Sequence, residues 1–332
     1  MDNASGQMGA FVLEFARFVG GLGQRFFALR RKQEGILKTS ILVLGLALLP
    51  AVANAQALPS WVTPAAQDDV SEELLNAVRD GDQAARDVAY PAVPNTVPQV
   101  IREGLDGNGI CMGCHTTTGM GAPQSAPLAG LPAAYIVRQM VNFRTGARGQ
   151  AYRANMAAFA SDMTIEQISE VADYYSALPY EPRIEVVETA MVPRTYTGPR
   201  DITVPLPNGG EEALGERIVE VPKTYAAPYM HDGVAFTAFV PVGSIARGRE
   251  LSERGLGRTI SCGLCHGEDL QGNGDIPAIA GRSPMHNARQ LMEYRGGMRN
   301  GPMARGMIEV AEELSDADVI AISAYIASLP PN

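Results

Sequence analysis

Apolar positions divide the chain into regions of different character. A short apolar run at residues 41–49 follows a stretch that carries several Lys and Arg residues. Further along, residues 164–178 and 315–329 place apolar side chains at helical spacing, each behind a Thr or Ser that can serve as an N-cap. Residues 182–245 are instead rich in Val, Thr, Tyr and Pro. The pattern predicts a mainly α protein interrupted by a β-rich segment.

The N-terminal residues 1–55 have the features of an export signal. Basic residues precede the apolar run, and Ala53-Asn54-Ala55 forms an A-x-A cleavage site. The apolar run is short for a transmembrane helix. We therefore predict a cleaved export signal, with an uncleaved membrane anchor as the alternative. Residues 56–95, which are rich in Pro and Ala, are expected to form a loosely structured N-terminal segment.

The β-rich segment contains an echo of its own. Val192-Pro193-Arg194-Thr195-Tyr196 recurs as Val221-Pro222-Lys223-Thr224-Tyr225. Between the two copies, Pro207-Asn208-Gly209-Gly210 is a signal for a hairpin turn. We expect a small β-ribbon that packs on one or both of the helical regions, either as a structural spacer or as a docking surface.

Composition and charge narrow the class of protein. The 46% of hydrophobic and 19% of charged residues are typical of a soluble globular protein. The formal charge of −9 argues against nucleic acid or an anionic membrane surface as the partner.

The four cysteines indicate the chemistry. All of them fall in two pentapeptides, Cys111-Met112-Gly113-Cys114-His115 and Cys262-Gly263-Leu264-Cys265-His266. C-x-x-C-H is the signature for covalent haem attachment. The two thiols add to the haem vinyl groups, and the adjacent histidine ligates the iron. A redox C-x-x-C motif would need a surrounding βαβ pattern, and a zinc site would need its ligands in one cluster. The sequence thus predicts two covalently bound haem c groups.

An internal repeat relates the two motifs. Shifting the sequence by 151 residues superposes 111–179 on 262–330 without a gap. We call these ranges the first repeat and the second repeat. Matching pairs include Arg138 and Arg289, Arg144 and Arg295, Arg148 and Arg299, and Tyr174 and Tyr325. The two repeats are therefore predicted to share one architecture.

The repeat also points to a second axial ligand for each iron. Within the repeats, only Met156 and Met307 coincide with another methionine at the 151-residue offset. Each precedes one of the predicted amphipathic helices, so a thioether on a loop there could reach the iron face opposite the histidine. We predict His115 and Met156 as ligands of one iron, and His266 and Met307 as ligands of the other. Met163 and Met303 are the alternatives.

The two repeats resemble class I cytochrome c domains, and the tandem pair is similar to the dihaem periplasmic cytochromes of the cytochrome c-four type. The resemblance implies two class I cytochrome c domains, residues 96–181 and 246–332, joined by the β-rich insertion 182–245. The insertion is a departure, since the family uses a short linker. The family also offers a proline carbonyl to the proximal histidine. Pro277 matches that proline, whereas the first repeat has Ala126 there.

Other polar residues give weaker signals. The recurring Arg138, Arg144, Arg289 and Arg295 are suited to haem propionates or to an exposed helix face. His231 and His286 could replace a methionine as iron ligand, but we expect surface or hydrogen-bonding roles, because His286 coincides with Tyr135 in the repeat and His231 lies in the insertion.

The resemblance implies a periplasmic dihaem cytochrome that carries electrons between redox proteins and is not an enzyme. A dehydrogenase, an oxidase or another cytochrome would be its donor or acceptor, and a membrane complex is a further candidate partner. Two alternatives stay open: the cytochrome subunit of a membrane or periplasmic dehydrogenase complex, and a dihaem peroxidase. The peroxidase needs a vacant or displaceable iron ligand, so the matched methionines argue against it.

Overall fold

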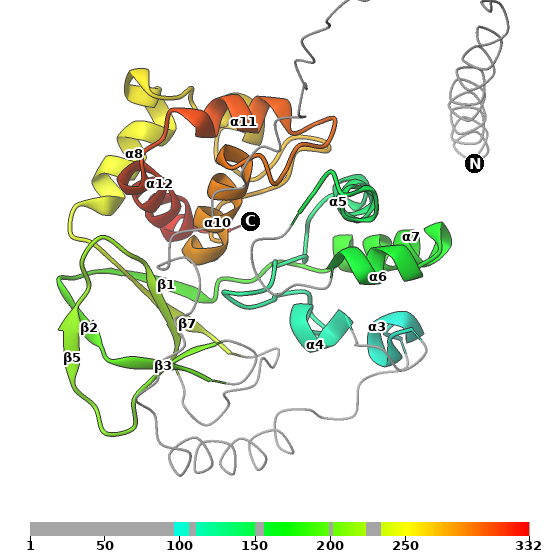
Figure 1. Ribbon diagram of the computed structural model, residues 1–332, viewed down its shortest axis with the longest axis horizontal. Coiled ribbons are helices and arrows are strands. Elements are labelled where there is room, and N and C mark those ends of the chain that lie inside the picture. Colours follow the sequence, from blue (N-terminus) through cyan, green and yellow to red (C-terminus); the bar gives the residue numbers. More distant parts are fainter. Residues whose placement is uncertain (1–95, 106–110, 150–155, 199–201, 224–233, 332) are drawn as a thin grey trace, which may run out of the picture. The chain divides into compact units, whose positions relative to one another are not determined.

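The structure is a computed structural model that describes residues 96–105, 111–149, 156–198, 202–223 and 234–331. Along these ranges, helices precede and follow a segment of short strands (Figure 1). The predicted export signal, the N-terminal segment 56–95 and His231 lie outside the described residues. Within the described ranges, no helix is long and apolar enough to cross a membrane.

The helices before the strands carry the first repeat. They are α3 (Gln99–Glu103), α4 (Cys111–His115), α5 (Ala133–Thr145), α6 (Met156–Asp162) and α7 (Ile165–Ser176). Helix α7 begins where the sequence predicts it. The Thr164 hydroxyl accepts a hydrogen bond from the backbone N–H of Gln167, whose side chain accepts one from the backbone of Thr164. Ile101, Phe143 and Tyr175 are buried in the core of this part.

The helices after the strands carry the second repeat. They are α8 (Ser244–Arg254), the 3-10 helix η3 (Gly255–Gly257), α9 (Gly263–His266), α10 (Pro284–Arg295), α11 (Arg305–Glu312) and α12 (Asp316–Ser328). Helix α12 packs against α8 and α10 (Figure 1). At the contact with α8, a Cβ on Gly248 would overlap the backbone carbonyl of Ala321, so the glycine permits the close approach. Ser315 caps α12 as predicted and accepts from Asp318 N at 3.2 Å.

The strands form small sheets instead of one ribbon. β1 (Ile184–Glu188), β7 (Phe236–Val240) and β6 (Val219–Pro222) make a mixed sheet in which β1 and β7 are parallel. β2 (Met191–Pro193) pairs with β5 (Glu211–Ala213), and β3 (Thr195–Thr197) pairs with β4 (Thr203–Pro205). The expectation of a single β-ribbon is therefore wrong, since most of these pairings are non-local.

The predicted hairpin is also corrected. A turn does lie at residues 207–210, where Gly209 and Gly210 have φ of 70° and 98° and Gly209 N donates to Leu206 O. The flanking strands β4 and β5, however, pair with β3 and β2 and not with each other. Strands β4 and β5 contribute to different apolar clusters: Val204 of β4 is buried in one, and Leu214, just after β5, is buried in another.

Candidate haem sites

The first C-x-x-C-H motif forms helix α4, and its histidine is oriented by a loop that follows. His115 Nδ1 lies 2.8 Å from the carbonyl oxygen of Ala126. This contact fits an Nδ1–H donor, which leaves Nε2 as the lone-pair nitrogen that can ligate a metal. Burial lowers the pKa of His115 and outweighs the opposite effect of the Ala126 carbonyl. The imidazole is thus held in the neutral form that binds iron.

The second motif repeats this geometry. Cys262 precedes helix α9, which ends at His266, and His266 Nδ1 lies 2.8 Å from the carbonyl oxygen of Pro277. Burial again lowers the pKa of the histidine. Pro277 and Ala126 are equivalent at the 151-residue offset, so the carbonyl expected from the sequence is present in both repeats.

The two cysteines of each motif differ in exposure. Cys114 and Cys265 are exposed, while Cys111 and Cys262 are half-buried, and none of the four forms a disulfide. Burial raises the pKa of Cys111 to about 11, so its free thiol is neutral before haem is attached. The described residues hold no group of three or more His, Cys, Asp or Glu side chains that could bind a metal ion, such as the zinc alternative requires.

The two predicted axial methionines lie on short helices and not on loops. Met156 is the first residue of α6, and Met307 lies within α11. Both are half-buried and pack against the core of their own repeat. Two short helices, α6 and α11, precede the predicted amphipathic helices, and the sequence pattern did not distinguish these short helices from loops. The matched pair therefore keeps equivalent places in the two repeats.

The repeats contact each other through equivalent residues. Arg148 donates to Gln139 Oε1 at 3.0 Å and to Gln290 Oε1 at 2.7 Å. Arg299 donates to the same two oxygens, at 2.9 Å to Gln139 and at 2.8 Å to Gln290. The backbone pairs likewise, with Gly149 N donating to Met298 O at 2.6 Å and Asn300 N to Ala147 O at 2.8 Å. The contact is thus related by an approximate two-fold axis.

Positive charge accumulates at this contact. Arg282, Arg289 and Arg299 are buried, and Arg148 is half-buried with an Nε that has no hydrogen-bond partner among the described residues. Burial and the nearby Arg299 lower the pKa of Arg148 to about 10. The carboxylate of the buried Glu293 raises the pKa of both Arg148 and Arg299. An anionic group would relieve the excess charge, and haem propionates are anions, so these residues fit haem.

The sequence pointed to other arginines as partners of the haem propionates. Arg144 and Arg295 donate to backbone carbonyls before α7 and α12. Arg138 and Arg289 reach across to Asp275 and Gln124 of the opposite repeat. The pair Arg148 and Arg299 was visible as a match in the repeat, but only the structure places the two guanidinium groups together.

The comparisons with known proteins decide the family. The sequence profile described as Cytochrome c matches residues 245–330. Cytochrome c-554(548) of Halomonas halodenitrificans (strain ATCC 12084 / NCIMB 8669) is 39% identical over 69 residues, which are 20% of this chain and 83% of that protein. The chain belongs to the cytochrome c family. The family resemblance found in the sequence is confirmed, and the cofactor of this cytochrome is covalently bound haem c.

Longer relatives of this cytochrome c were found as well. The "Thiosulfate dehydrogenase electron acceptor" of Thiomonas intermedia (strain K12) is 27% identical over 223 residues, which are 66% of this chain and 78% of that protein. The solved structure of thiosulfate dehydrogenase (TsdBA) from Marichromatium purpuratum has a TM-score of 0.48 and 27% identity; the match covers 70% of this chain and only 39% of that chain. Cytochrome c4 of Acidithiobacillus ferrooxidans has a TM-score of 0.45 and 20% identity over 66% of this chain and 98% of that chain.

Proposed function

We propose that this cytochrome is a dihaem electron carrier, with one haem in each repeat. The observation that carries the proposal is the equal hydrogen bond of the two motif histidines, 2.8 Å from His115 to Ala126 O and 2.8 Å from His266 to Pro277 O. In both repeats this contact leaves Nε2 of the imidazole as the nitrogen that could ligate a metal. Two motifs built alike favour two haems over one.

The ligands proposed from the sequence fit this function. Haem iron supplies reversible one-electron exchange between its ferric and ferrous forms. Side chains in both axial positions leave no open site for a substrate, which favours a carrier over an enzyme. The proposed attachment residues are Cys111, Cys114, Cys262 and Cys265, and the proposed iron ligands are His115, Met156, His266 and Met307.

The proposed organisation follows the element order. Residues 96–181 and 246–332 would form two class I cytochrome c domains, with residues 182–245 as the β-rich insertion. Residues 1–55 would direct the chain to the periplasm, and residues 56–95 would precede the first domain. Export supports haem attachment by thioether bonds, which c-type cytochromes acquire outside the cytoplasm.

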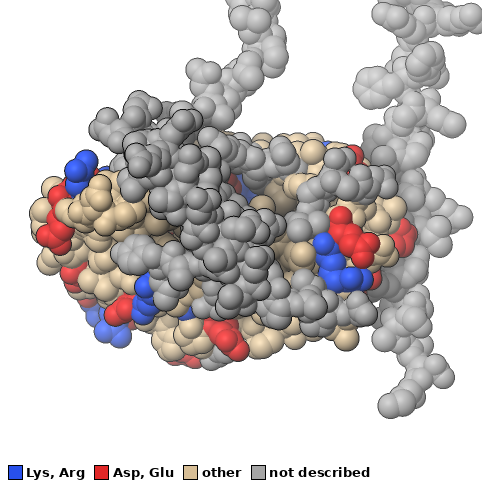
Figure 2. All heavy atoms as spheres, turned by 90° about the horizontal axis from the view of Figure 1, so that it is seen from below, with Lys and Arg blue, Asp and Glu red and all other residues tan. Residues whose placement is uncertain are grey.

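A dehydrogenase is the proposed electron donor. The chain covers 78% of a relative whose name describes an electron acceptor of thiosulfate dehydrogenase. The same name favours a second possibility, a permanent subunit of such a dehydrogenase. On the uncovered parts of the face in Figure 2, acidic and basic side chains lie in small neighbouring groups, with no large visible area of one charge. Specific docking contacts, more than long-range charge, would then select the partner.

Cofactor content tests the proposal. The purified, exported protein should retain two haems per chain after acid-acetone extraction, because thioether bonds survive this treatment. Cys111→Ala combined with Cys114→Ala should leave one haem, as should Cys262→Ala combined with Cys265→Ala. A potentiometric titration should then show two one-electron transitions in the unmutated protein and one in each double variant. Haem that is extracted from the unmutated protein would contradict the proposal.

A further inference from the structure

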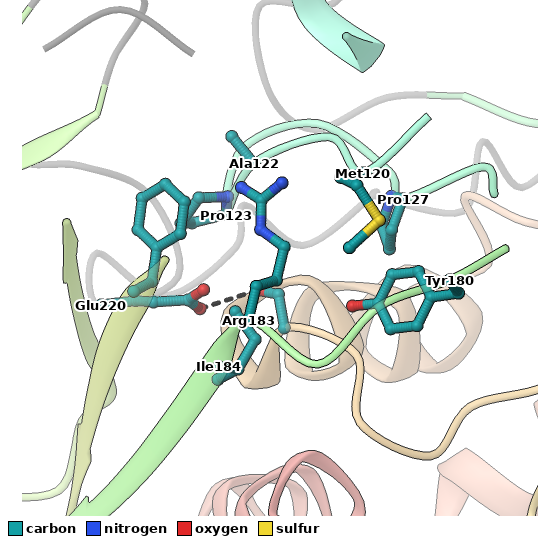
Figure 3. A pocket seen from close by; sticks show the side chains of 10 residues that line it. Met120, Ala122, Pro123, Pro127, Tyr180, Arg183, Ile184 and Glu220 are labelled. Carbon is teal, nitrogen blue, oxygen red and sulfur yellow. Dashed lines mark hydrogen bonds between the residues drawn. The ribbon is translucent and has the colours of Figure 1, made fainter. Parts of the chain in front are cut away.

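A carboxyl group is buried where the strands meet both repeats. Glu220 lies on β6 and is only 1% exposed. Its Oε2 accepts a hydrogen bond from the Ser283 hydroxyl at 2.7 Å, drawn as a dashed line in Figure 3, and one from Met285 N at 3.4 Å. Both donors lie at the beginning of α10. Its Oε1 has no hydrogen-bond partner among the described residues. A buried carboxylate oxygen without a partner is unfavourable, so this group needs an explanation.

A small cavity adjoins this carboxyl group. Its volume is about 10 Å³, close to the least that accommodates one water molecule. Figure 3 shows Met120 and Pro127 of the first repeat, Tyr180 and Arg183 of the following segment, and Glu220 around it. Glu220 lines this cavity, so a water molecule there would lie beside its carboxyl group.

The groups that face Glu220 favour its charged form only weakly. The opposed strand β7 presents Ala238, and residues 120–127 contain no ionisable side chain. Burial raises the pKa of Glu220 to about 7 and outweighs the hydrogen bonds from Ser283 and Met285 N and the charges of Arg183 and Arg289, which lower it. Two other ionisable groups on this side donate their hydrogen bonds elsewhere: Arg282 donates to Pro127 O and Ala129 O, and Tyr180 donates to Gly281 O. A third, His286, is neutral, because burial among arginines lowers its pKa well below its usual range.

The cavity also adjoins the loop that orients a haem ligand. Pro127 lines the cavity, and the preceding residue, Ala126, accepts the hydrogen bond of His115 at 2.8 Å. Arg183 ties the same loop to the strands, since it donates to Gly121 O at 3.0 Å. A charge added near His115 is therefore expected to act on Glu220 through a largely apolar, buried region, where electrostatic interactions are strong.

We propose that Glu220 is a redox-linked proton-binding site for the haem of the first repeat. When an electron enters that repeat from the donor protein, the carboxylate takes up one proton from water. When the electron leaves, the carboxyl group returns the proton to water. The loss of the carboxylate charge offsets the charge that the electron adds. This inference rests on the proposed function, because it requires a redox-active haem.

A potentiometric titration of the holoprotein from mildly acidic to mildly alkaline pH tests this site. In the unmutated protein, one midpoint potential should fall as the pH rises through neutrality, because proton uptake accompanies reduction there. Glu220→Gln, which keeps an amide in place of the carboxyl group, should remove this part of the pH dependence. Glu185→Gln is the matched control: Glu185 lies on the same sheet, has a side chain that is 57% exposed and pairs with Lys223, so the pH dependence should persist.

A second variant tests the direction of the effect. The Ser283 hydroxyl stabilises the carboxylate form of Glu220, so Ser283→Ala should move the pH-dependent segment of the potential to higher pH. In the unmutated protein, a reduced-minus-oxidised infrared difference spectrum near neutral pH should show a protonated-carboxyl C=O band appearing on reduction. This spectrum needs no variant, so absence of the band overturns the proposal even if Glu220→Gln fails to fold.

The outcomes separate the two proposals. Absence of any haem redox transition would overturn the electron-transfer function and this site together. Two normal transitions whose pH dependence is the same with and without Glu220→Gln would overturn the proton site alone. A missing carboxyl band in the infrared difference spectrum would also overturn the proton site.

Discussion

The environments of four methionines differ in ways that bear on iron ligation. Met163 is 6% exposed and lies in the apolar core of the first repeat, whereas Met303 is 67% exposed. Met156 and Met307 lie between these extremes, each at the edge of a core. A ligand methionine needs this partial exposure, since its sulfur must face a cofactor and not other side chains. The alternatives are thus less suited than the matched pair.

Replacing either matched methionine should remove one thioether ligand. Met156→Ala and Met307→Ala should each abolish about half of the weak near-infrared sulfur-to-iron band and lower one midpoint potential, because Met/His ligation raises it. Met163→Leu is the control, because Leu314 occupies the equivalent position in the second repeat. It should keep the full band and cost less than about 1.5 kcal/mol of stability. An unchanged band in Met156→Ala would assign the ligand elsewhere.

Asp318 links a helix cap to two arginines. Its side chain is fully buried, bonds the Ser315 N-cap, and lies 2.5 Å from Arg247 and 2.9 Å from Arg258. Burial alone would raise the pKa of this carboxyl group, but the hydrogen bonds from Ser315 and Arg247 outweigh burial and lower the pKa from 3.8 to about 2.

The pH dependence of stability should reveal this group. Because the folded-state pKa is depressed, its stabilising effect is complete above pH 3.8 and is lost as the pH falls toward about 2. Asp318→Asn should lower the free energy of unfolding by about 2 kcal/mol at neutral pH and reduce the loss of stability in acid. Thermal unfolding of the holoprotein at several pH values measures both effects. Glu312→Gln, at an exposed position, should change neither; an Asp318→Asn variant as stable as the parent would contradict the assignment.

Residues whose role depends on a short sequence motif could be predicted. Residues whose role depends on contacts with distant parts of the chain could not. The motif cysteines and histidines are indicated by their spacing within one repeat, and the carbonyl at Ala126 or Pro277 is implied by the resemblance to class I cytochrome c domains. Glu220 could not be found in this way, because its burial results from contact with Ser283 and with residues 120–127, far away in the chain. A lone glutamate in a strand carries no sign of that environment.

At the scale of elements, helix boundaries follow local signals closely. Helices α7 and α12 begin directly after Thr164 and Ser315, because each side chain satisfies backbone N–H groups that a helix start leaves open. Strand pairing has no comparable local signal. The turn at residues 207–210 forms, but the partners of its flanking strands are chosen by apolar clusters elsewhere, which the sequence pattern did not show.

The contact between α8 and α12 depends on a glycine. Gly248→Ala should destabilise the second repeat by about 1–3 kcal/mol, the usual range for overpacking, because its Cβ would overlap the Ala321 carbonyl. Chemical denaturation followed by haem absorbance measures the change. Glu250→Ala, at an exposed position of the same helix, should stay within about 0.5 kcal/mol of the parent. Equal effects of the two substitutions would mean that the helices can separate without loss.

At the scale of the whole molecule, the two repeats are joined by a shared polar contact. Arg148 and Arg299 both bond the same two glutamine oxygens, so each guanidinium group serves both repeats. Two cations this close repel each other, and the contact would be strengthened by an anion between them.

Removing one of these charges should change a haem midpoint potential. Arg148→Gln or Arg299→Gln should lower at least one midpoint potential by about 40 mV, equivalent to about 1 kcal/mol for a one-electron couple, because a nearby cation favours the reduced haem. Potentiometric titration measures this shift. Arg249→Gln is the control, since that side chain is 65% exposed on α8. A shift of the same size in the control would show a general charge effect.

The parallel pairing of β1 and β7 has a consequence for how this molecule tolerates change in length. Strand β1 begins soon after the first repeat and β7 ends just before α8, and Ile184 lies opposite Phe236. Because the two strands are parallel, the chain between them leaves β1 at Glu188 and enters β7 at Phe236, so the strand pairing fixes both ends of this excursion. Residues can be added to or removed from that excursion while the spacing of the two redox centres stays the same. The length of the connection and the distance over which an electron must pass are thereby independent quantities.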